Sequence, residues 1–402
     1  MCLDKVSDAG YIQTLMRDLS RILDTVPEPG SNRRIVVGMS GGVDSSVTAL
    51  LLKQKGYEVI GITMHLWTYD QVGGDPDNRA TCCGMDGIND ARAVCHRIGA
   101  PHYVADLRED FGRSVIHNFV NEYLDGRTPN PCVVCNHRVK WEPLLDRAAS
   151  LGADRIATGH YARIAWDVAL GRYMLLRARD PQKDQTYVLW GLSQEKVRRT
   201  LLPLGGLTKE EVRAVARDYG LRTADKPDSQ DICFIVDRDV ERFMRHRARI
   251  EGISVPSLEP GPILDAEDRR VGTHRGAAFY TVGQRRGLGV AAPEPRYVIA
   301  IDPARNAIRV GGTEELLACE VAASSANWIA GEGPSPGTRA EAKMRYRHDA
   351  SPGTLLACAD GNIRFRFDEP QRAITPGQSL VLYQGERLLG GGIIDSALGG
   401  TA

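Results

Sequence analysis

Blocks of apolar residues separated by polar stretches predict alternating strands and helices in the first half of the chain. Four short apolar runs have the length and composition of buried strands, at residues 35–39, 58–64, 102–106 and 155–159. Apolar side chains recur at helical spacing over residues 47–52, 88–98, 111–123 and 144–151. Such a series predicts an α/β fold with an open parallel sheet covered by helices, and ligands at the carboxyl ends of its strands.

The pattern changes after about residue 236. The basic segment Arg238–Arg249 predicts a short helix, and proline, glycine and short strands dominate beyond it. Three of these strands are predicted at 340–346, 363–367 and 379–383. We therefore predict a small β-rich middle domain followed by a β-barrel or sandwich. The expected organisation is an N-terminal extension at 1–31, the parallel-sheet domain at 32–236, the middle domain at 237–312 and a C-terminal β-barrel domain at 313–402.

The composition is that of an ordinary globular protein. The 402 residues are 42% hydrophobic and 25% charged, and the formal net charge is zero. No run approaches the roughly 20 apolar residues that a membrane span needs, and no signal sequence is readable. Nine cysteines at irregular spacing indicate a reducing cytoplasm, where thiols do chemistry or bind metal. Without net charge, any nucleic acid must bind through local basic patches.

The segment Ser40–Ser45, with the sequence SGGVDS, joins the first predicted strand to the first predicted helix. Its glycines let the backbone approach an anion, and the helix N-terminus offers unpaired N–H groups, so we expect a phosphate site. Neither a Walker lysine nor a G-x-G-x-x-G pattern is present, so a P-loop NTPase and a dinucleotide fold are not indicated. Met64 and the pair Gly159-His160 follow other strands at the same edge, which predicts one site.

Cysteines give the second signal. Cys132 and Cys135 form a C-x-x-C pair in a segment that we expect to be a loop, and Cys233 follows in another loop about a hundred residues on. Such a pair alone is compatible with a redox dithiol, half of a metal site, or coincidence. Cys82-Cys83 is the only other close pair, and adjacent cysteines rarely chelate one ion well. We interpret the remaining cysteines as small hydrophobic residues: Cys2, Cys95, Cys319 and Cys358.

The SGGVDS segment resembles the pyrophosphate loop of the ATP pyrophosphatases, whose catalytic domain is adenine nucleotide α-hydrolase-like. Seven motifs in order resemble, more narrowly, the tRNA-specific 2-thiouridylase family, over about residues 33–395. The motifs are Gly38–Ser45, Gly126–Pro131, Cys135-Asn136, Ala157–Tyr161, Lys183–Gln185, Asp228-Ser229 with Ile232–Ile235, and Gly283–Gly289. The resemblance implies ATP-dependent 2-thiolation of the wobble uridine of tRNA, in which the C2 oxygen is first adenylated.

Site roles follow from the resemblance. It implies that ATP is bound by Gly38, Met39, Ser40, Gly41, Gly42, Val43, Asp44, Ser45, Met64 and Gly159. Asp44 is the expected ligand of Mg²⁺. Sulfur is expected to arrive as a persulfide on Cys233, and Cys135 to attack it, leaving a transient disulfide between the two.

One position departs from the family. The family loop reads Asn-Pro-Asp, and here Cys132 replaces the aspartate. Cys132, Cys135 and Cys233 together could hold three irons of a four-iron iron-sulfur cluster, through which sulfur would pass without a protein persulfide. We favour the persulfide route, and the motif leaves the cluster route open.

The resemblance also implies contacts with the anticodon stem-loop of the tRNAs for Lys, Glu and Gln. The residues that it assigns are Asn130, Pro131, Cys132, His160, Lys183, Asp184, Gln185, Arg345, Tyr346 and Gln378. The sulfur donor is expected to be a cysteine desulfurase or a relay protein, and the enzyme a cytoplasmic monomer. Two alternatives are an ATP-pyrophosphatase ligase acting on a small molecule and a non-enzymatic RNA-binding or sulfur-carrier module.

Overall fold

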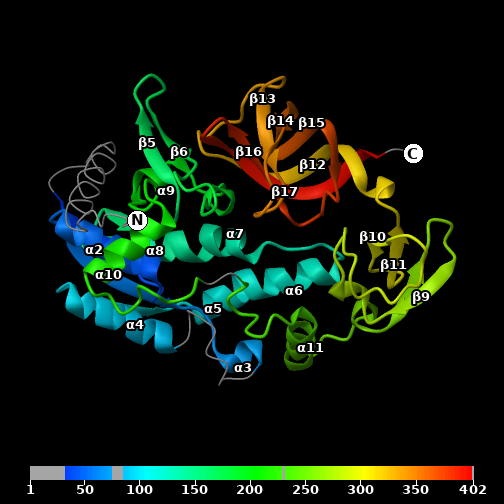
Figure 1. Ribbon diagram of the computed structural model, residues 1–402, viewed down its shortest axis with the longest axis horizontal. Coiled ribbons are helices and arrows are strands. Elements are labelled where there is room, and N and C mark those ends of the chain that lie inside the picture. Colours follow the sequence, from blue (N-terminus) through cyan, green and yellow to red (C-terminus); the bar gives the residue numbers. More distant parts are fainter. Residues whose placement is uncertain (1–31, 75–84, 229–230, 401–402) are drawn as a thin grey trace, which may run out of the picture.

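The computed structural model describes residues 32–74, 85–228 and 231–400 (Figure 1). The predicted extension at 1–31 with its Cys2, the pair Cys82-Cys83 and Ser229 lie outside the described residues. Within the described part of the chain, no helix is both long enough and apolar enough to cross a bilayer.

The first domain is built on a five-stranded sheet in the order β3-β2-β1-β4-β7, with every pairing parallel. Its strands are β1 (Arg34–Gly38), β2 (Glu58–His65), β3 (His102–Asp106), β4 (Arg155–Ala157) and β7 (Thr200–Leu201). In the central strand, Ile35, Val36 and Val37 are wholly buried. A strand covered on both faces reads as a continuous apolar run, so the prediction of a parallel sheet is confirmed.

Helices connect and cover these strands (Figure 1). They are α2 (Val43–Gln54), α3 (Tyr69–Val72), α4 (Met85–Arg97), α5 (Arg108–Phe111), α6 (His117–Leu124), α7 (Pro131–Cys135), α8 (Trp141–Ser150), α9 (Gln194–Arg198), α10 (Lys209–Asp218) and α11 (Val240–Glu251). The helix predicted over 111–123 is interrupted by a π-helical turn, η1 (Gly112–Ile116). Short 3-10 turns are η3 (Thr186–Val188), η4 (Pro256–Leu258), η5 (Ala277–Phe279) and η6 (Glu314–Leu316).

The loop predicted around the C-x-x-C pair is wrong, because this segment is helical. Helix α7 runs directly into a second π-helical turn, η2 (Asn136–Lys140), and then into α8. Asn130 is the N-cap, since its side chain accepts a hydrogen bond from the Val133 amide, and Pro131 stands in the first turn. Proline and a capping asparagine are the usual start of a helix, so polar residues that suggested a loop belong to a helix start.

The middle domain is a small four-stranded sheet in the order β10-β11-β8-β9. Its strands are β8 (Gly261–Leu264), β9 (Arg270–His274), β10 (Tyr297–Asp302) and β11 (Ala307–Gly311). A separate core of Ile263, Val298 and Ile308, all wholly buried, supports them. The domain lies at the far end of the molecule from α2 and α4 (Figure 1).

The last domain is a closed antiparallel barrel in the order β12-β15-β14-β13-β16-β17, with β17 pairing back onto β12. Its strands are β12 (Leu317–Trp328), β13 (Arg339–Lys343), β14 (Ser351–Ala359), β15 (Asn362–Arg372), β16 (Ser379–Gln384) and β17 (Arg387–Gly400). Ile363, Phe365 and Phe367 alternate inward along β15. Closure leaves no barrel edge unpaired, and the predicted β-barrel is confirmed.

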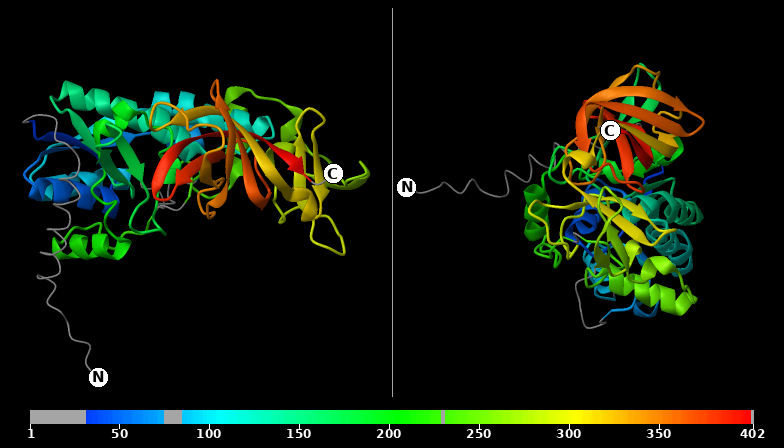
Figure 2. Two further views of the ribbon diagram at one scale, coloured as in Figure 1. Left: turned by 90° about the horizontal axis from the view of Figure 1, so that it is seen from above. Right: turned by 90° about the vertical axis from the view of Figure 1, so that its right-hand side faces the viewer.

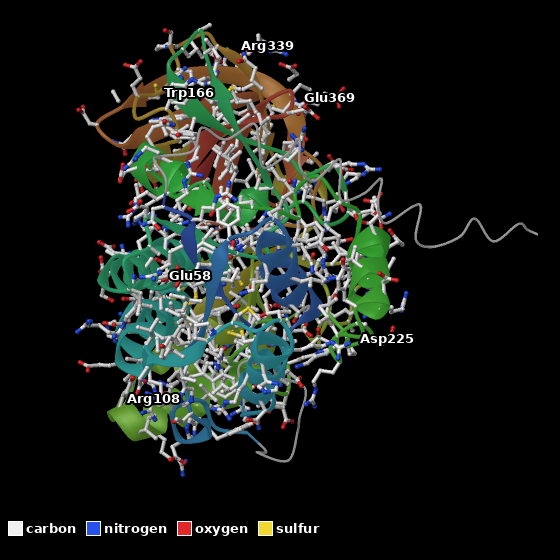
Figure 3. All side chains as sticks on the ribbon, turned by 90° about the vertical axis from the view of Figure 1, so that its left-hand side faces the viewer. Glu58, Arg108, Trp166, Asp225, Arg339 and Glu369 are labelled. Carbon is white, nitrogen blue, oxygen red and sulfur yellow. The ribbon has the colours of Figure 1, made fainter. Side chains whose placement is uncertain are left out.

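A hairpin of the first domain extends this barrel sheet. Strands β5 (Arg163–Asp167) and β6 (Arg172–Leu176) pair with each other, and β6 pairs with β17. Figure 3 labels Trp166 on this hairpin, which stands beside the barrel in Figure 1. The hairpin of the first domain and the barrel therefore share one sheet, and Figure 2 shows the molecule from two further sides.

Candidate active site

The glycine loop forms the centre of the site. It leaves β1 and enters α2, and its hydroxyls are already arranged: Ser45 Oγ accepts from the Ser40 amide at 3.1 Å, and Ser46 Oγ donates to the Gly42 carbonyl at 2.7 Å. Gly42 is the N-cap of α2 and has no side-chain cap. The first N–H groups of this twelve-residue helix are therefore available to an anion.

Two glycines are required by close approach. Gly41 has φ +72°, and a Cβ there would lie 2.2 Å from the Gly87 carbonyl oxygen. A Cβ at Gly159, after β4, would lie 2.9 Å from the Ser45 amide nitrogen. Side chains at either position would displace the loop or the first turn of α2. The structure thus brings the predicted nucleotide residues of β1 and β4 to one edge.

Met64 completes this edge from β2. Its terminal methyl lies 3.8 Å from where a Cβ on Gly38 would stand, and the side chain is half-buried. Parallel pairing of β1 with both β2 and β4 carries all three segments to the same sheet edge. The geometry fits a nucleotide whose phosphates lie on the loop and whose base lies against the strand ends.

Asp44, the expected Mg²⁺ ligand, is held by residues that sequence reasoning missed. Lys209 Nζ lies 2.7 and 2.8 Å from its two carboxylate oxygens, and the Tyr161 hydroxyl donates to Oδ1 at 2.8 Å. Lys209 also reaches Asp228 Oδ1 at 2.8 Å. One readable signal existed: Thr208 and Glu211 form a capping box, which places Lys209 first in α10, where a positive charge opposes the helix dipole.

Further basic side chains surround the same loop. Asp228 also pairs with Lys183 at 2.9 Å and with Arg213 at 3.0 Å. Burial alone would raise the pKa of Asp228, but hydrogen bonds from Lys209 and Lys183 outweigh it, and the pKa is lowered. Lys226 donates to the Gly41 carbonyl at 3.0 Å and pairs with Asp90 at 2.7 Å.

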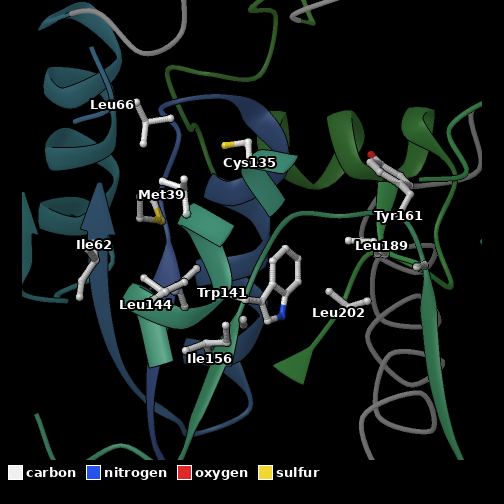
Figure 4. Packing of buried hydrophobic residues seen from close by; sticks show 14 of the residues in the cluster. Met39, Ile62, Leu66, Cys135, Trp141, Leu144, Ile156, Tyr161, Leu189 and Leu202 are labelled. Carbon is white, nitrogen blue, oxygen red and sulfur yellow. The ribbon is translucent and has the colours of Figure 1, made fainter. Parts of the chain in front are cut away.

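Two of the three motif cysteines, Cys132 and Cys135, lie in α7, and Cys233 lies in the turns after Asp228. Cys132 is exposed, Cys135 is 6% exposed and belongs to the same buried cluster as Met39 and Trp141 (Figure 4), and Cys233 is half-buried. Burial raises the pKa of Cys135 to about 12; the charge of Lys140 opposes this, whereas Cys233 and Cys132 add to it. Although Cys132 is exposed, surrounding protein raises the pKa of its thiol, and Cys233 raises it further.

The thiols do not form a ready metal site. Among the described residues, which include all three cysteines, no group of three or more His, Cys, Asp or Glu side chains is arranged to hold a metal ion. The charge of Cys233 raises the pKa of both Cys132 and Cys135. We derive no step through a four-iron cluster.

His160 lies beside the start of α8. Its ring is 5.3 Å from that of Trp141, and Nδ1 is 2.8 Å from the Thr158 hydroxyl. Burial, with a smaller contribution from Lys140, lowers the pKa of His160 to about 3. The imidazole is therefore neutral at physiological pH and can exchange neutral hydrogen bonds.

Three of the other residues assigned to tRNA contact form hydrogen bonds inside the protein. Asp184 is buried and accepts from the Ala178 amide, and Gln185 accepts from the Tyr161 amide. Gln378 donates to the Thr128 carbonyl at 2.9 Å, which ties the barrel to the segment before α7. These three side chains all make hydrogen bonds within the protein.

Barrel residues also approach the cysteines. Tyr346 is 39% exposed, and its pKa is raised by burial first and then by the charges of Asp184 and Cys132. Arg345 is half-buried and donates to the Ala373 carbonyl and the Thr375 hydroxyl. The barrel therefore forms one wall near Cys132, with an exposed aromatic ring available for stacking.

A parallel sheet with an open glycine loop and a cysteine helix at the same edge defines a nucleotide-binding α/β domain with a thiol site. Known families agree with this division. Residues 33–237 match the family described as tRNA methyl transferase HUP domain, residues 254–312 match its PRC-barrel domain, and residues 319–394 match an aminomethyltransferase beta-barrel domain.

Curated relatives are more specific. Proteins named tRNA-specific 2-thiouridylase MnmA are 48% identical in Pelotomaculum thermopropionicum (90% of this chain, 97% of that one), 49% in Geotalea uraniireducens (91% and 96%) and 47% in Salinibacter ruber (90% and 94%). The chain belongs to the tRNA-specific 2-thiouridylase family, and it is a sulfurtransferase.

Solved structures are more distant. The U34-tRNA thiolase NcsA from Methanococcus maripaludis, solved with its [4Fe-4S] cluster, gives a TM-score of 0.37 at 20% identity, over 61% of this chain and 77% of that one. An NMN synthetase from Francisella tularensis gives 0.35 at 17%, over 62% and 89%. Likeness at this level carries no argument about function.

Proposed function

We propose that this protein catalyses the ATP-dependent 2-thiolation of the wobble uridine of the tRNAs for Lys, Glu and Gln. The observation that carries the proposal is an anion-binding glycine loop at the carboxyl edge of the parallel sheet, together with Cys132, Cys135 and Cys233, whose charges act on one another, in a chain of the 2-thiouridylase family. Such an edge can activate a carbonyl with ATP and deliver sulfur to it without moving the substrate.

Activation comes first because the C2 oxygen of uracil is a poor leaving group. That oxygen attacks the α-phosphorus of ATP, the bond to the β-phosphate breaks, and pyrophosphate leaves with the electron pair. The loop around Gly41 and Gly42 holds the pyrophosphate, and Met64 and Gly159 border the adenosine. Mg²⁺, with Asp44 as a ligand, would neutralise phosphate charge when bound.

Sulfur transfer follows at the cysteines. A persulfide on Cys233 attacks C2, and AMP leaves with the electron pair of the C–O bond. The Cys135 thiolate then attacks the Cys233 sulfur, the S–S bond breaks toward the nucleoside, and 2-thiouridine and a Cys135–Cys233 disulfide form. A thiol reductant restores both cysteines. The sulfur itself comes from a cysteine desulfurase or a relay protein.

The target base must leave the anticodon stack to reach this edge. Tyr346 is suited to stack on nucleotides, and Arg345 to contact phosphate beside it. Asn130, Pro131 and Cys132 stand nearest the extruded base at the start of α7. The remaining proposed contacts are His160, Lys183, Asp184, Gln185 and Gln378, and we propose that the enzyme acts as a cytoplasmic monomer.

The test is thiolation of an unmodified glutamate tRNA transcript by anaerobically purified protein with ATP, Mg²⁺, a thiol reductant, and a cysteine desulfurase with cysteine as the source of persulfide sulfur. We expect 2-thiouridine in step with AMP, and loss of the product in Cys135→Ser but not in Cys358→Ser, a barrel cysteine whose thiol donates to the Pro334 carbonyl. Full thiolation by Cys135→Ser would refute the role of Cys135 in sulfur transfer, and no 2-thiouridine from a wild-type protein that binds ATP would favour a small-molecule ligase. Stoichiometric iron in the active sample would replace the persulfide route with a cluster.

A further inference from the structure

The ammonium of Lys209 is the most enclosed charge near the nucleotide loop. Its side chain is 8% exposed, and the residue begins α10 rather than lying on the protein surface. A buried ammonium is costly unless it is paired and hydrogen-bonded. Asp44 and Asp228 supply that pairing at 2.7 and 2.8 Å. Asp44 lies 165 residues before Lys209, and Asp228 lies 19 residues after it.

Lys209 stands at the start of α10, where a lysine does not stabilise the helix. Helix stability therefore does not explain why a lysine is found there. The first turn of a helix favours acidic side chains, because its unpaired N–H groups carry partial positive charge. Lys209 adds a full positive charge to that end, and its own amide donates to Asp180 at 3.0 Å. The N-termini of α10 and α2 therefore meet at one place, each with a positive end, with a lysine between them.

The surrounding ion pairs favour an anion as well. In the network that joins the loop to its neighbours, basic side chains outnumber carboxylates. The basic members among the described residues are Lys183, Lys209, Arg213, Arg222 and Lys226, and the carboxylates are Asp44, Asp90 and Asp228. A multiply charged phosphate group would balance this excess.

We propose that Lys209 is a catalytic residue of the adenylation step, whose ammonium binds the β- and γ-phosphates of ATP and then the departing pyrophosphate. The proposal rests on the proposed function. Without nucleotide, Asp44 and Asp228 hold the ammonium at the loop. When ATP binds, its phosphates replace Asp44 and Asp228 as partners of the Lys209 ammonium. The Asp44 carboxylate is then available to Mg²⁺. Tyr161, hydrogen-bonded to Asp44, is a positioning residue for this exchange.

The experiment measures binding of inorganic pyrophosphate, ATP and AMP, each with Mg²⁺, to the full chain and to Lys209→Met. We expect pyrophosphate and ATP to bind roughly tenfold more weakly or worse, the effect of losing a charge-assisted hydrogen bond, while AMP affinity stays within about twofold. The matched control is Lys53→Met, at the other end of α2, where the ammonium donates to the Gly99 carbonyl. It should change none of the three affinities.

Unchanged pyrophosphate affinity in Lys209→Met, or an equal loss for pyrophosphate and AMP, would overturn the proposal. If this variant does not fold, the same titrations are made with Lys209→Met combined with Asp228→Asn, which removes one charge of each sign. A wild-type protein that thiolates tRNA while Lys209→Met keeps its pyrophosphate affinity would refute only this inference. A wild-type protein that binds neither pyrophosphate nor ATP would refute the proposed function itself.

Discussion

Single residues three positions apart can differ greatly in chemistry. Cys132 is exposed at the start of α7, whereas Cys135 is 6% exposed among core residues. A pKa raised to about 12 means that the Cys135 thiolate is scarce at neutral pH and rises about tenfold per pH unit up to that value. We therefore expect iodoacetamide to modify Cys132 well before Cys135 at pH 8, and the Cys135 rate to climb through pH 10.

Peptide mass spectrometry over a pH series checks this difference, with Cys95 as an internal reference. Burial raises the pKa of Cys95 to about 11, and the residue is wholly buried in the same core. It should be as slow to react as Cys135. Equal rates for Cys132 and Cys135 at pH 8 would mean that α7 opens readily in the free protein, and that the burial seen here does not control access.

The residues of the site were readable from sequence to different degrees. The loop, Met64 and Gly159 each follow a strand of a parallel sheet, and chain order alone places them at one edge. Lys209 was not found, and Tyr161 was found only as part of a motif without a role, because both roles depend on pairing with Asp44 across 165 and 117 residues. The spacing of hydrophobic residues does not indicate contacts between polar side chains so far apart in the sequence.

At the scale of elements, α7, which carries Cys132 and Cys135, shows where prediction from the local sequence fails. Asparagine and proline before a C-x-x-C pair suggested a loop, yet both are helix-start residues when apolar positions follow. Val133 and Val139 are buried and hold α7 and η2 against the core. The π-helical turns η1 and η2 could not be predicted, since a single inserted residue leaves no periodic signature.

The segment that carries Cys233 is anchored by its neighbour. Phe234 is 1% exposed, and its ring lies 5.7, 5.2 and 5.2 Å from those of Phe111, Phe119 and Phe243. We expect Phe234→Leu to lower the free energy of unfolding by about 1–2 kcal/mol, through lost ring contacts and a small void. Because this anchor fixes the adjacent thiol, thiolation turnover should fall roughly tenfold as well.

Phe365→Leu is the matched control, because this barrel residue is wholly buried and pairs with Phe367 at 5.1 Å. Denaturant unfolding and thiolation rates are measured for both variants. The barrel variant should lose similar stability while keeping its turnover. If both variants slow thiolation equally, reduced stability and not the position of Cys233 explains the loss.

At the scale of the whole molecule, the three-domain plan was predictable but the contacts between domains were not. The β-barrel followed from short strands between turn residues. Nothing in the sequence indicated that hairpin β5–β6 would join its sheet, or that Gln378 would bond to the carbonyls of Thr128 and Pro129. These contacts join the barrel to the hairpin of the first domain and to the segment before α7.

Zero net charge gives the last prediction, which concerns how the whole molecule binds tRNA. Without a global field, attraction must come from local basic groups, and Arg285 and Arg286 in the middle domain are exposed. Each phosphate contact contributes about 0.7–0.9 to the slope of log affinity against log salt. We expect tRNA affinity to fall steeply with salt, and Arg285→Ala combined with Arg286→Ala to reduce that slope by about 1–2.

Filter-binding titrations of one tRNA from low to moderate salt measure both slopes. Arg339→Ala is the control, since that barrel arginine is paired with Asp368 and its charge is already compensated. It should leave the slope unchanged. A double variant with the wild-type slope would place the middle domain outside the tRNA footprint. The three motif cysteines belong to the first domain, whereas Arg285 and Arg286 belong to the middle domain. A reduced slope with unchanged turnover at saturating tRNA would therefore assign the middle domain to tRNA binding and the first domain to the chemical steps.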